Sequence, residues 1–146
     1  MGAARLRRGA RVGAMLAALL VAGAAGAGER VPESEIERIF SGMTLDGTYA
    51  NGSFFSETYN SDGTIRYHDP DGADSGEWSV KDGRFCTFYE NAEGACFAVE
   101  RDGANCFTFY APSGTSSDAP LNPDWTSRGW DTTLPPTCPK APEVQL

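Results

Sequence analysis

Histidine, basic residues and long apolar runs are all scarce in this 146-residue chain, and each shortage excludes a class of protein. A zinc site would need thiolates beside the only histidine, His68, but the four cysteines are better explained as disulfides. No Gly-x-Ser-x-Gly motif is present, so the serines do not indicate an α/β-hydrolase nucleophile. We therefore expect a protein that is not an enzyme and that holds no cofactor.

The N-terminal 27 residues are typical of a secretory signal peptide. Four arginines precede an apolar run over residues 12–25, which leads into the small-residue cleavage pattern Ala25-Gly26-Ala27. The alternative is a membrane anchor, but this run is rich in Ala and Gly and shorter than the about 20 residues that a spanning helix needs. We predict cleavage after Ala27 and a mature chain that is periplasmic or secreted, with no membrane span.

The predicted mature chain is strongly acidic. It keeps eight basic residues against twenty acidic ones, a net charge of −12. Nucleic acids and anionic membrane surfaces are poor partners for such a chain, because neutralising phosphate requires Lys and Arg. Cationic or neutral partners are favoured, although an acidic surface can also serve only to keep a small exported protein soluble.

The 119 residues that follow the predicted cleavage site suit one domain, which we expect to be monomeric. Residues 28–111 predict a helix and a β-meander, and residues 112–146 a proline-rich wrap within the same domain. In the predicted helix over residues 32–41, Ile36, Ile39 and Phe40 share one face. Gly42 can end this helix, which we expect to pack over the sheet or across one end of a barrel.

Seven short runs with a period of two follow the helix, each ending in a turn rich in Gly, Asp and Asn. The expected strands cover residues 45–49, 54–59, 64–68, 76–80, 84–89, 96–100 and 106–110. A loop over residues 69–76 separates the third strand from the fourth. This spacing predicts a mainly β fold, an antiparallel meander that forms either a barrel or a coiled sheet.

Three of the four cysteines lie in these strands, which predicts a disulfide-stapled domain. If the hairpin turn is centred on Asn91, Cys86 lies opposite Cys96, close enough to bridge, and Phe85 lies opposite Phe97 on the other face. Cys106 would then pair with Cys138. Four cysteines allow three pairings, so the spacing alone leaves the others open.

Proline is concentrated after residue 111, where seven of the nine occur. This segment is therefore expected to be neither a central strand nor a helix, but an extended wrap held by Cys138. Its two tryptophans, Trp125 and Trp130, are expected to cover one end of the barrel, with an exposed ligand-facing pair as the alternative.

Several short motifs resemble a family of small exported β-domains, known mainly from alphaproteobacteria and without an assigned function. They are residues 40–44 (FSGMT), 62–64 (DGT), 76–80 (GEWSV), 82–86 (DGRFC) and 96–99 (CFAV). The resemblance spans residues 36–110 and implies an exported β-domain with a disulfide equivalent to Cys86–Cys96. Cys106 and Cys138 lie outside its pattern, which supports pairing them together. Gly-x-Trp also occurs in lipocalin-like and avidin-like barrels.

The densest polar cluster lies in the loop between the third and fourth predicted strands. Carboxylates in a Gly-containing loop can bind calcium, but the glycine here is displaced from its place in an EF-hand. A Pro-Asp-Gly turn explains the same residues without a metal. The weak calcium candidates are Asp69, Asp71, Asp74 and Glu77.

The function expected from these features is a binding or interaction module of the bacterial envelope. The first hypothesis is an acidic, inhibitor-like domain for a cationic protein partner. The alternative is a carrier that binds a small apolar ligand inside the barrel. A small hydrolase that uses loop carboxylates or His68 is the weakest hypothesis. The candidate ligand or partner contacts are Tyr67, His68, Trp78, Trp125 and Trp130.

Overall fold

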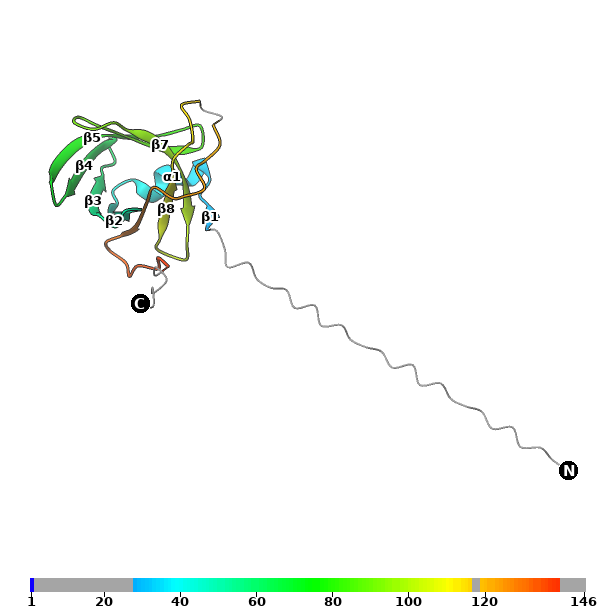
Figure 1. Ribbon diagram of the computed structural model, residues 1–146. Helices are drawn as coiled ribbons and strands as arrows, with labels where there is room; N and C mark the ends of the chain where they lie inside the picture. The colour runs from blue at the N-terminus through cyan, green and yellow to red at the C-terminus, as the bar shows by residue number, and fades with distance from the viewer. Residues whose placement is uncertain (2–27, 117–118, 140–146) are drawn as a thin grey trace, which may run out of the picture.

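The computed structural model describes Met1 and residues 28–116 and 119–139. The predicted signal peptide beyond Met1 and the last seven residues of the tail lie outside this part. One β-sheet and one short helix make up the described part of the chain (Figure 1). The strands are β1 (Glu29–Arg30), β2 (Thr44–Tyr49), β3 (Phe54–Tyr59), β4 (Thr64–Asp69), β5 (Gly72–Lys81), β6 (Arg84–Tyr89), β7 (Ala95–Arg101), β8 (Phe107–Tyr110) and β9 (Ser127–Asp131).

Strands β2 to β9 form a closed antiparallel barrel of eight strands. The neighbours run β7-β6-β5-β4-β3-β2-β9-β8, and pairing of β8 with β7 closes the ring. The two-residue strand β1 lies outside this ring and pairs with Glu100 and Arg101 near the end of β7. The predicted mainly β meander is confirmed, and the choice between a barrel and a coiled sheet is settled in favour of the barrel.

The prediction of a loop over residues 69–76 is wrong. Strand β4 continues to Asp69 and β5 begins at Gly72, so the two strands form a long hairpin with a tight turn. Asp69 stabilises this turn because its Oδ1 accepts hydrogen bonds from the backbone N–H groups of Asp71 and Gly72. The Pro-Asp-Gly motif thus makes a two-residue connection instead of a long loop.

The tail contains a central strand, so the expectation that its prolines exclude one is wrong. Strand β9 pairs with β2 on one side and with β8 on the other, and so completes the barrel. The tail's prolines flank the stretch and do not interrupt it. Gly129 is required in β9, because a Cβ atom there would lie 2.6 Å from Cδ2 of Leu45 in β2.

Both predicted disulfides are present, and no cysteine is free. Cys86 and Cys96 are register partners on β6 and β7, and Phe85 pairs with Phe97 beside them, as the hairpin predicted. Cys106 forms a disulfide bond with Cys138, which links the tail to the start of β8. Two disulfides indicate an oxidising, exported environment. Among the described residues, no helix is long and apolar enough to cross a membrane.

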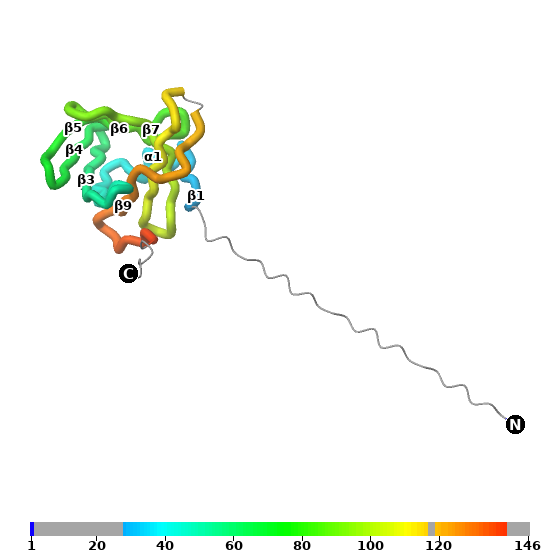
Figure 2. Tube along the Cα trace, viewed as in Figure 1, coloured from blue at the N-terminus to red at the C-terminus, as the bar shows by residue number. Residues whose placement is uncertain are grey.

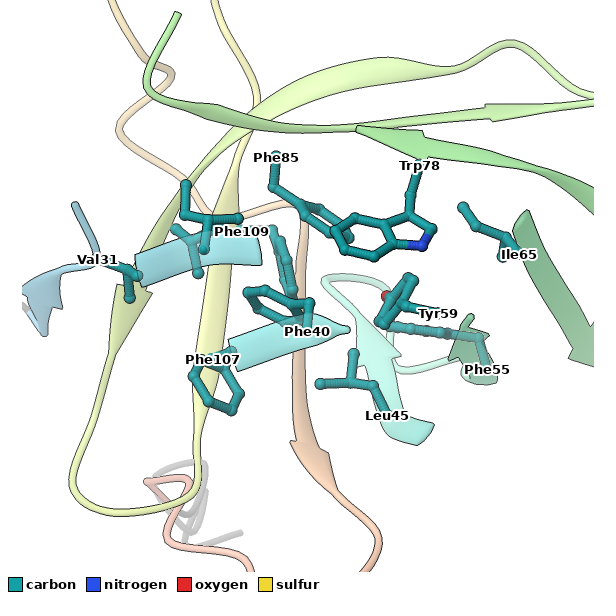
Figure 3. Packing of buried hydrophobic residues seen from close by; sticks show 12 residues of the cluster. Val31, Phe40, Leu45, Phe55, Tyr59, Ile65, Trp78, Phe85, Phe107 and Phe109 are labelled. Carbon is teal, nitrogen blue, oxygen red and sulfur yellow. The ribbon is translucent and has the colours of Figure 1, made fainter. Parts of the chain in front are cut away.

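Helix α1 (Glu33–Phe40) confirms the predicted helix and fills one end of the barrel. Its inner face carries Ile36 and Phe40, both fully buried. The ring of Phe40 lies 4.7 Å from that of Phe85 and 5.2 Å from that of Phe107, which places it at the centre of the core (Figure 3). Gly42 ends the helical segment with a φ of 82°. In Figure 2 the trace of α1 lies amid the strands in this view, while its outer face, with Glu37 and Arg38, is exposed.

Candidate functional site

A cavity of about 150 Å³ occupies the barrel interior at the end opposite α1. It is lined by Tyr49, Phe55, Glu57, Tyr59, Phe85, Thr87, Tyr89, Glu93, Ala95, Phe97, Phe109, Thr126 and Ser127. Most of these residues come from β2, β3, β6 and β7. Phe109 comes from β8, Thr126 directly precedes β9, and Ser127 is the first residue of β9. Their side chains reach the interior because alternate residues of a strand face the same side of a sheet.

The floor of the cavity is the core packed around α1. Tyr59, Phe85 and Phe109 line the cavity, and each also contacts the ring of Phe40. Figure 3 shows these rings gathered around the end of α1. The helix therefore blocks one end of the barrel and limits the interior space to the other end.

The cavity wall contains one buried carboxylate, that of Glu57 on β3. Only 5% of this residue is exposed. The sequence places it inside because Phe55, Glu57 and Tyr59 alternate along one strand and share its interior face. The hydroxyl of Tyr59 donates a hydrogen bond to Glu57 Oε2, and the hydroxyl of Tyr89 on β6 donates one to Oε1.

Among the described residues, Glu57 has no basic partner. The cavity lining includes no Lys, Arg or His, and in the described part of the chain the salt bridges are Arg30–Glu100 and Arg38–Glu35. Burial raises the pKa of the Glu57 carboxyl above its usual range, although the two tyrosine hydroxyls partly oppose the rise. Burial also raises the pKa of Tyr59 and of Tyr89, and the neighbouring Glu57 carboxylate adds to both shifts.

A second set of hydrogen bonds begins at Tyr49 in the cavity wall, at the same end of the barrel. The hydroxyl of Tyr49 donates to the hydroxyl of Tyr67 at 3.2 Å, and Tyr67 donates to Asp69 Oδ2 at 2.8 Å. The ring of Phe55 lies 4.7 Å from that of Tyr49 and is stacked on that of Tyr67. This hydrogen bond from Tyr67 lowers the pKa of Asp69, the opposite of the shift at Glu57.

The predicted contact residues do not lie together. Tyr67 accepts a hydrogen bond from the cavity residue Tyr49, whereas His68 is exposed on the outside of β4. Trp78 is 7% exposed, and its Nε1 donates to the carbonyl of Asn60 at 2.8 Å, so it is a core residue. Neither Trp125 nor Trp130 lines the cavity.

The two tail tryptophans lie away from the barrel interior. Trp125 packs against Arg128, whose guanidinium lies 5.0 Å from the ring centre. Trp130 is the register partner of Asp46, and both alternate with inward-facing residues of their strands. The tail instead contributes Thr126 and Ser127 to the cavity wall.

The four calcium candidates are not brought together either. Within residues 28–116 and 119–139, no group of three or more His, Cys, Asp or Glu side chains could hold a metal ion. Asp69 bonds the hairpin turn and Tyr67, and Asp74 accepts a hydrogen bond from Asn91 Nδ2 at 3.0 Å. These carboxylates stabilise turns and loop contacts.

Glu57 is the functional candidate that the sequence interpretation missed. The signal was available, because a charged residue between Phe55 and Tyr59 in a period-two strand must share their face. Tyr89, its partner 32 residues away, could not be assigned without the closed barrel.

Comparisons of the chain with protein-family models, with curated proteins and with solved structures give no match. The resemblance to small exported β-domains stays a prediction.

Proposed function

We propose that this protein is a non-enzymatic binding protein of the periplasm or the extracellular space, which holds a small ligand in its barrel cavity. One observation carries the proposal: a buried carboxylate with no basic partner faces a cavity whose other walls are mainly aromatic. Ligand pockets typically combine apolar walls with a few polar groups that fix the orientation of the ligand.

The size of the cavity limits the ligand. A cavity of about 150 Å³ has room for a molecule the size of benzene. Peptides, lipids with long acyl chains and nucleotides are too large for it. The proposed ligand is therefore a compact molecule that contacts the aromatic rings and hydrogen-bonds to Glu57.

An NMR titration with a panel of compact alcohols, amines and ammonium ions tests this proposal. Binding should shift the side-chain signals of cavity residues such as Ala95 and Thr87. The substitution Ala95→Leu places a larger side chain in the cavity wall and should abolish these shifts. Ala73→Leu adds the same side chain at an exposed position of β5 and should leave them unchanged. Shifts that persist in Ala95→Leu would contradict the proposal.

An acidic interaction module for a cationic protein partner is the second candidate. Phe88 is 50% exposed on the outer face of β6, beside its register partner Glu77 and its neighbour Glu90. An exposed aromatic ring between carboxylates suits a basic protein surface. Binding of this kind should weaken steeply with added salt and should be lost in Phe88→Ser. A salt-independent interaction would exclude this candidate.

A further inference from the structure

We infer that the ligand of the barrel cavity is a small organic cation, an alkylammonium compound whose charge pairs with Glu57. This inference rests on the proposed ligand-binding function and specifies the chemistry of the ligand. It follows from the charge of the cavity, from its aromatic walls and from its volume.

The charge of the cavity wall is unbalanced. Glu57 and Glu93 are its ionisable acids, and no basic residue lines it. An ionised carboxylate that is buried without a counter-charge is strongly unfavourable, so a cation that enters the cavity gains a large attraction. Glu93 lies in the loop between β6 and β7 and is exposed, where its charge favours entry of a cation.

The hydrogen bonds of Glu57 leave room for such a ligand. A carboxylate has about four acceptor positions, and the tyrosine hydroxyls of Tyr59 and Tyr89 occupy one on each oxygen. Both donors come from the protein, which fixes the orientation of the carboxylate before a ligand arrives. The remaining positions can accept from an ammonium N–H group or face a quaternary ammonium group.

Aromatic rings make up most of the remaining wall. The lining contains Tyr49, Phe55, Tyr59, Phe85, Tyr89, Phe97 and Phe109. The face of an aromatic ring attracts a cation, most strongly where both are shielded from water. Rings around one carboxylate are the arrangement that recognises methylated ammonium groups, because the rings contact the methyl groups while the carboxylate balances the charge.

A neutral ligand of the same shape is the competing possibility. A protonated Glu57 could donate a hydrogen bond to it, and the aromatic walls would contact it equally well. Choline and 3,3-dimethyl-1-butanol separate the two, since they have nearly the same shape and only choline carries a charge.

Calorimetric titration of the mature protein with each compound at pH 7.5 tests the inference. Choline should bind more tightly than the neutral alcohol by on the order of tenfold or more. In Glu57→Gln, which removes the charge and keeps one of the two acceptor oxygens, this preference should disappear. In the control Glu77→Gln, which removes an exposed carboxylate of β5 that does not line the cavity, it should persist.

The outcomes separate the inference from the proposed function. Equal or tighter binding of the neutral alcohol to the wild-type protein overturns the inference and leaves the cavity as a ligand site. Absence of binding by both compounds, and by the wider panel of amines and alcohols, overturns both. The wild-type comparison stands even if Glu57→Gln fails to fold, which its thermal unfolding transition will show.

Discussion

Tyr89 on β6 donates a hydrogen bond across the barrel interior to Glu57 on β3. Two strands, β4 and β5, separate these partners in the sheet, so the bond joins opposite walls and not neighbouring strands. Together with Tyr59 it holds a carboxylate between aromatic rings, where an unligated barrel would ordinarily contain apolar side chains. Such an arrangement opposes stability and is typical of a functional site.

The stability of the ligand-free protein should fall as the pH rises above about 4.5. Burial raises the pKa of Glu57 in the folded state above its value in the unfolded chain. Its protonated form therefore contributes to stability at a pH below the pKa of the unfolded state. This contribution is lost as the pH rises through the pKa of the folded state. Urea denaturation at several pH values measures this effect. The series should run from about pH 4.5 to about pH 8, where carboxyl groups with raised pKa values titrate.

The tyrosines around Glu57 and the nearby Asp69 do not hide this effect. The surrounding tyrosines have raised pKa values and stay neutral; they are Tyr49, Tyr59, Tyr67 and Tyr89. Asp69, beside Tyr67, has a lowered pKa, so its contribution to stability changes at lower pH. In Glu57→Gln the decline should be absent. A decline equal to that of the wild type would contradict the assignment.

Tyr89→Phe should destabilise the protein at pH 7 by about 1.5–3 kcal/mol, the range for a hydrogen bond to a charged group. Loss of this donor leaves the ionised Glu57 less well solvated and should raise its pKa further. Tyr49→Phe is the control, because its hydroxyl bonds Tyr67 and not Glu57. Urea denaturation and the carboxyl carbon NMR signal of Glu57 report the two effects. Equal pKa values in Tyr89→Phe and the wild type would refute this role.

Phe40→Ala should reduce the free energy of unfolding by about 3–5 kcal/mol, the usual range for removal of a buried aromatic side chain. Phe40 is fully buried and contacts the rings that form the floor of the cavity. Ligand binding should weaken as well, because the floor loses its support. Phe54→Ala removes a similar side chain that is 40% exposed and should have a small effect. Similar losses for both variants would contradict this account of the core.

The two disulfides should differ in how much they contribute to the free energy of unfolding. Cys106 and Cys138 are 32 residues apart, whereas Cys86 and Cys96 are 10 apart within one hairpin. A longer closed loop restricts the unfolded chain more, so replacing the Cys106–Cys138 pair by alanines should be about 1 kcal/mol more destabilising. Urea denaturation of the two double variants tests the order. The reverse order would show that the bridge to the tail adds little to the closure of the barrel.

Local pattern was enough to predict the helix and the meander. Ile36 and Phe40 share a helical face, and Cys86 opposite Cys96 follows from counting across one turn. These features depend on residues that are near each other in the sequence. Strand β9 escaped prediction because nearby prolines disfavour strands, whereas its partners β2 and β8 lie far away in the chain.

The site was harder to predict for the same reason. Alternation shows that Glu57 shares a face with Phe55 and Tyr59, but only closure of the barrel makes that face an interior. The sequence offered all three tryptophans as candidate ligand or partner contacts. Trp78 instead packs in the core, and Trp125 and Trp130 lie away from the cavity.

The central claim is that the ionised carboxylate of Glu57 is the group that binds the ligand. The most direct test is the affinity of the wild-type protein for choline as a function of pH. A cation prefers the ionised form, so the affinity should rise with pH until the raised pKa of Glu57 is passed, and binding below that pH should release a proton. An affinity that is constant or falls over this range would contradict the claim.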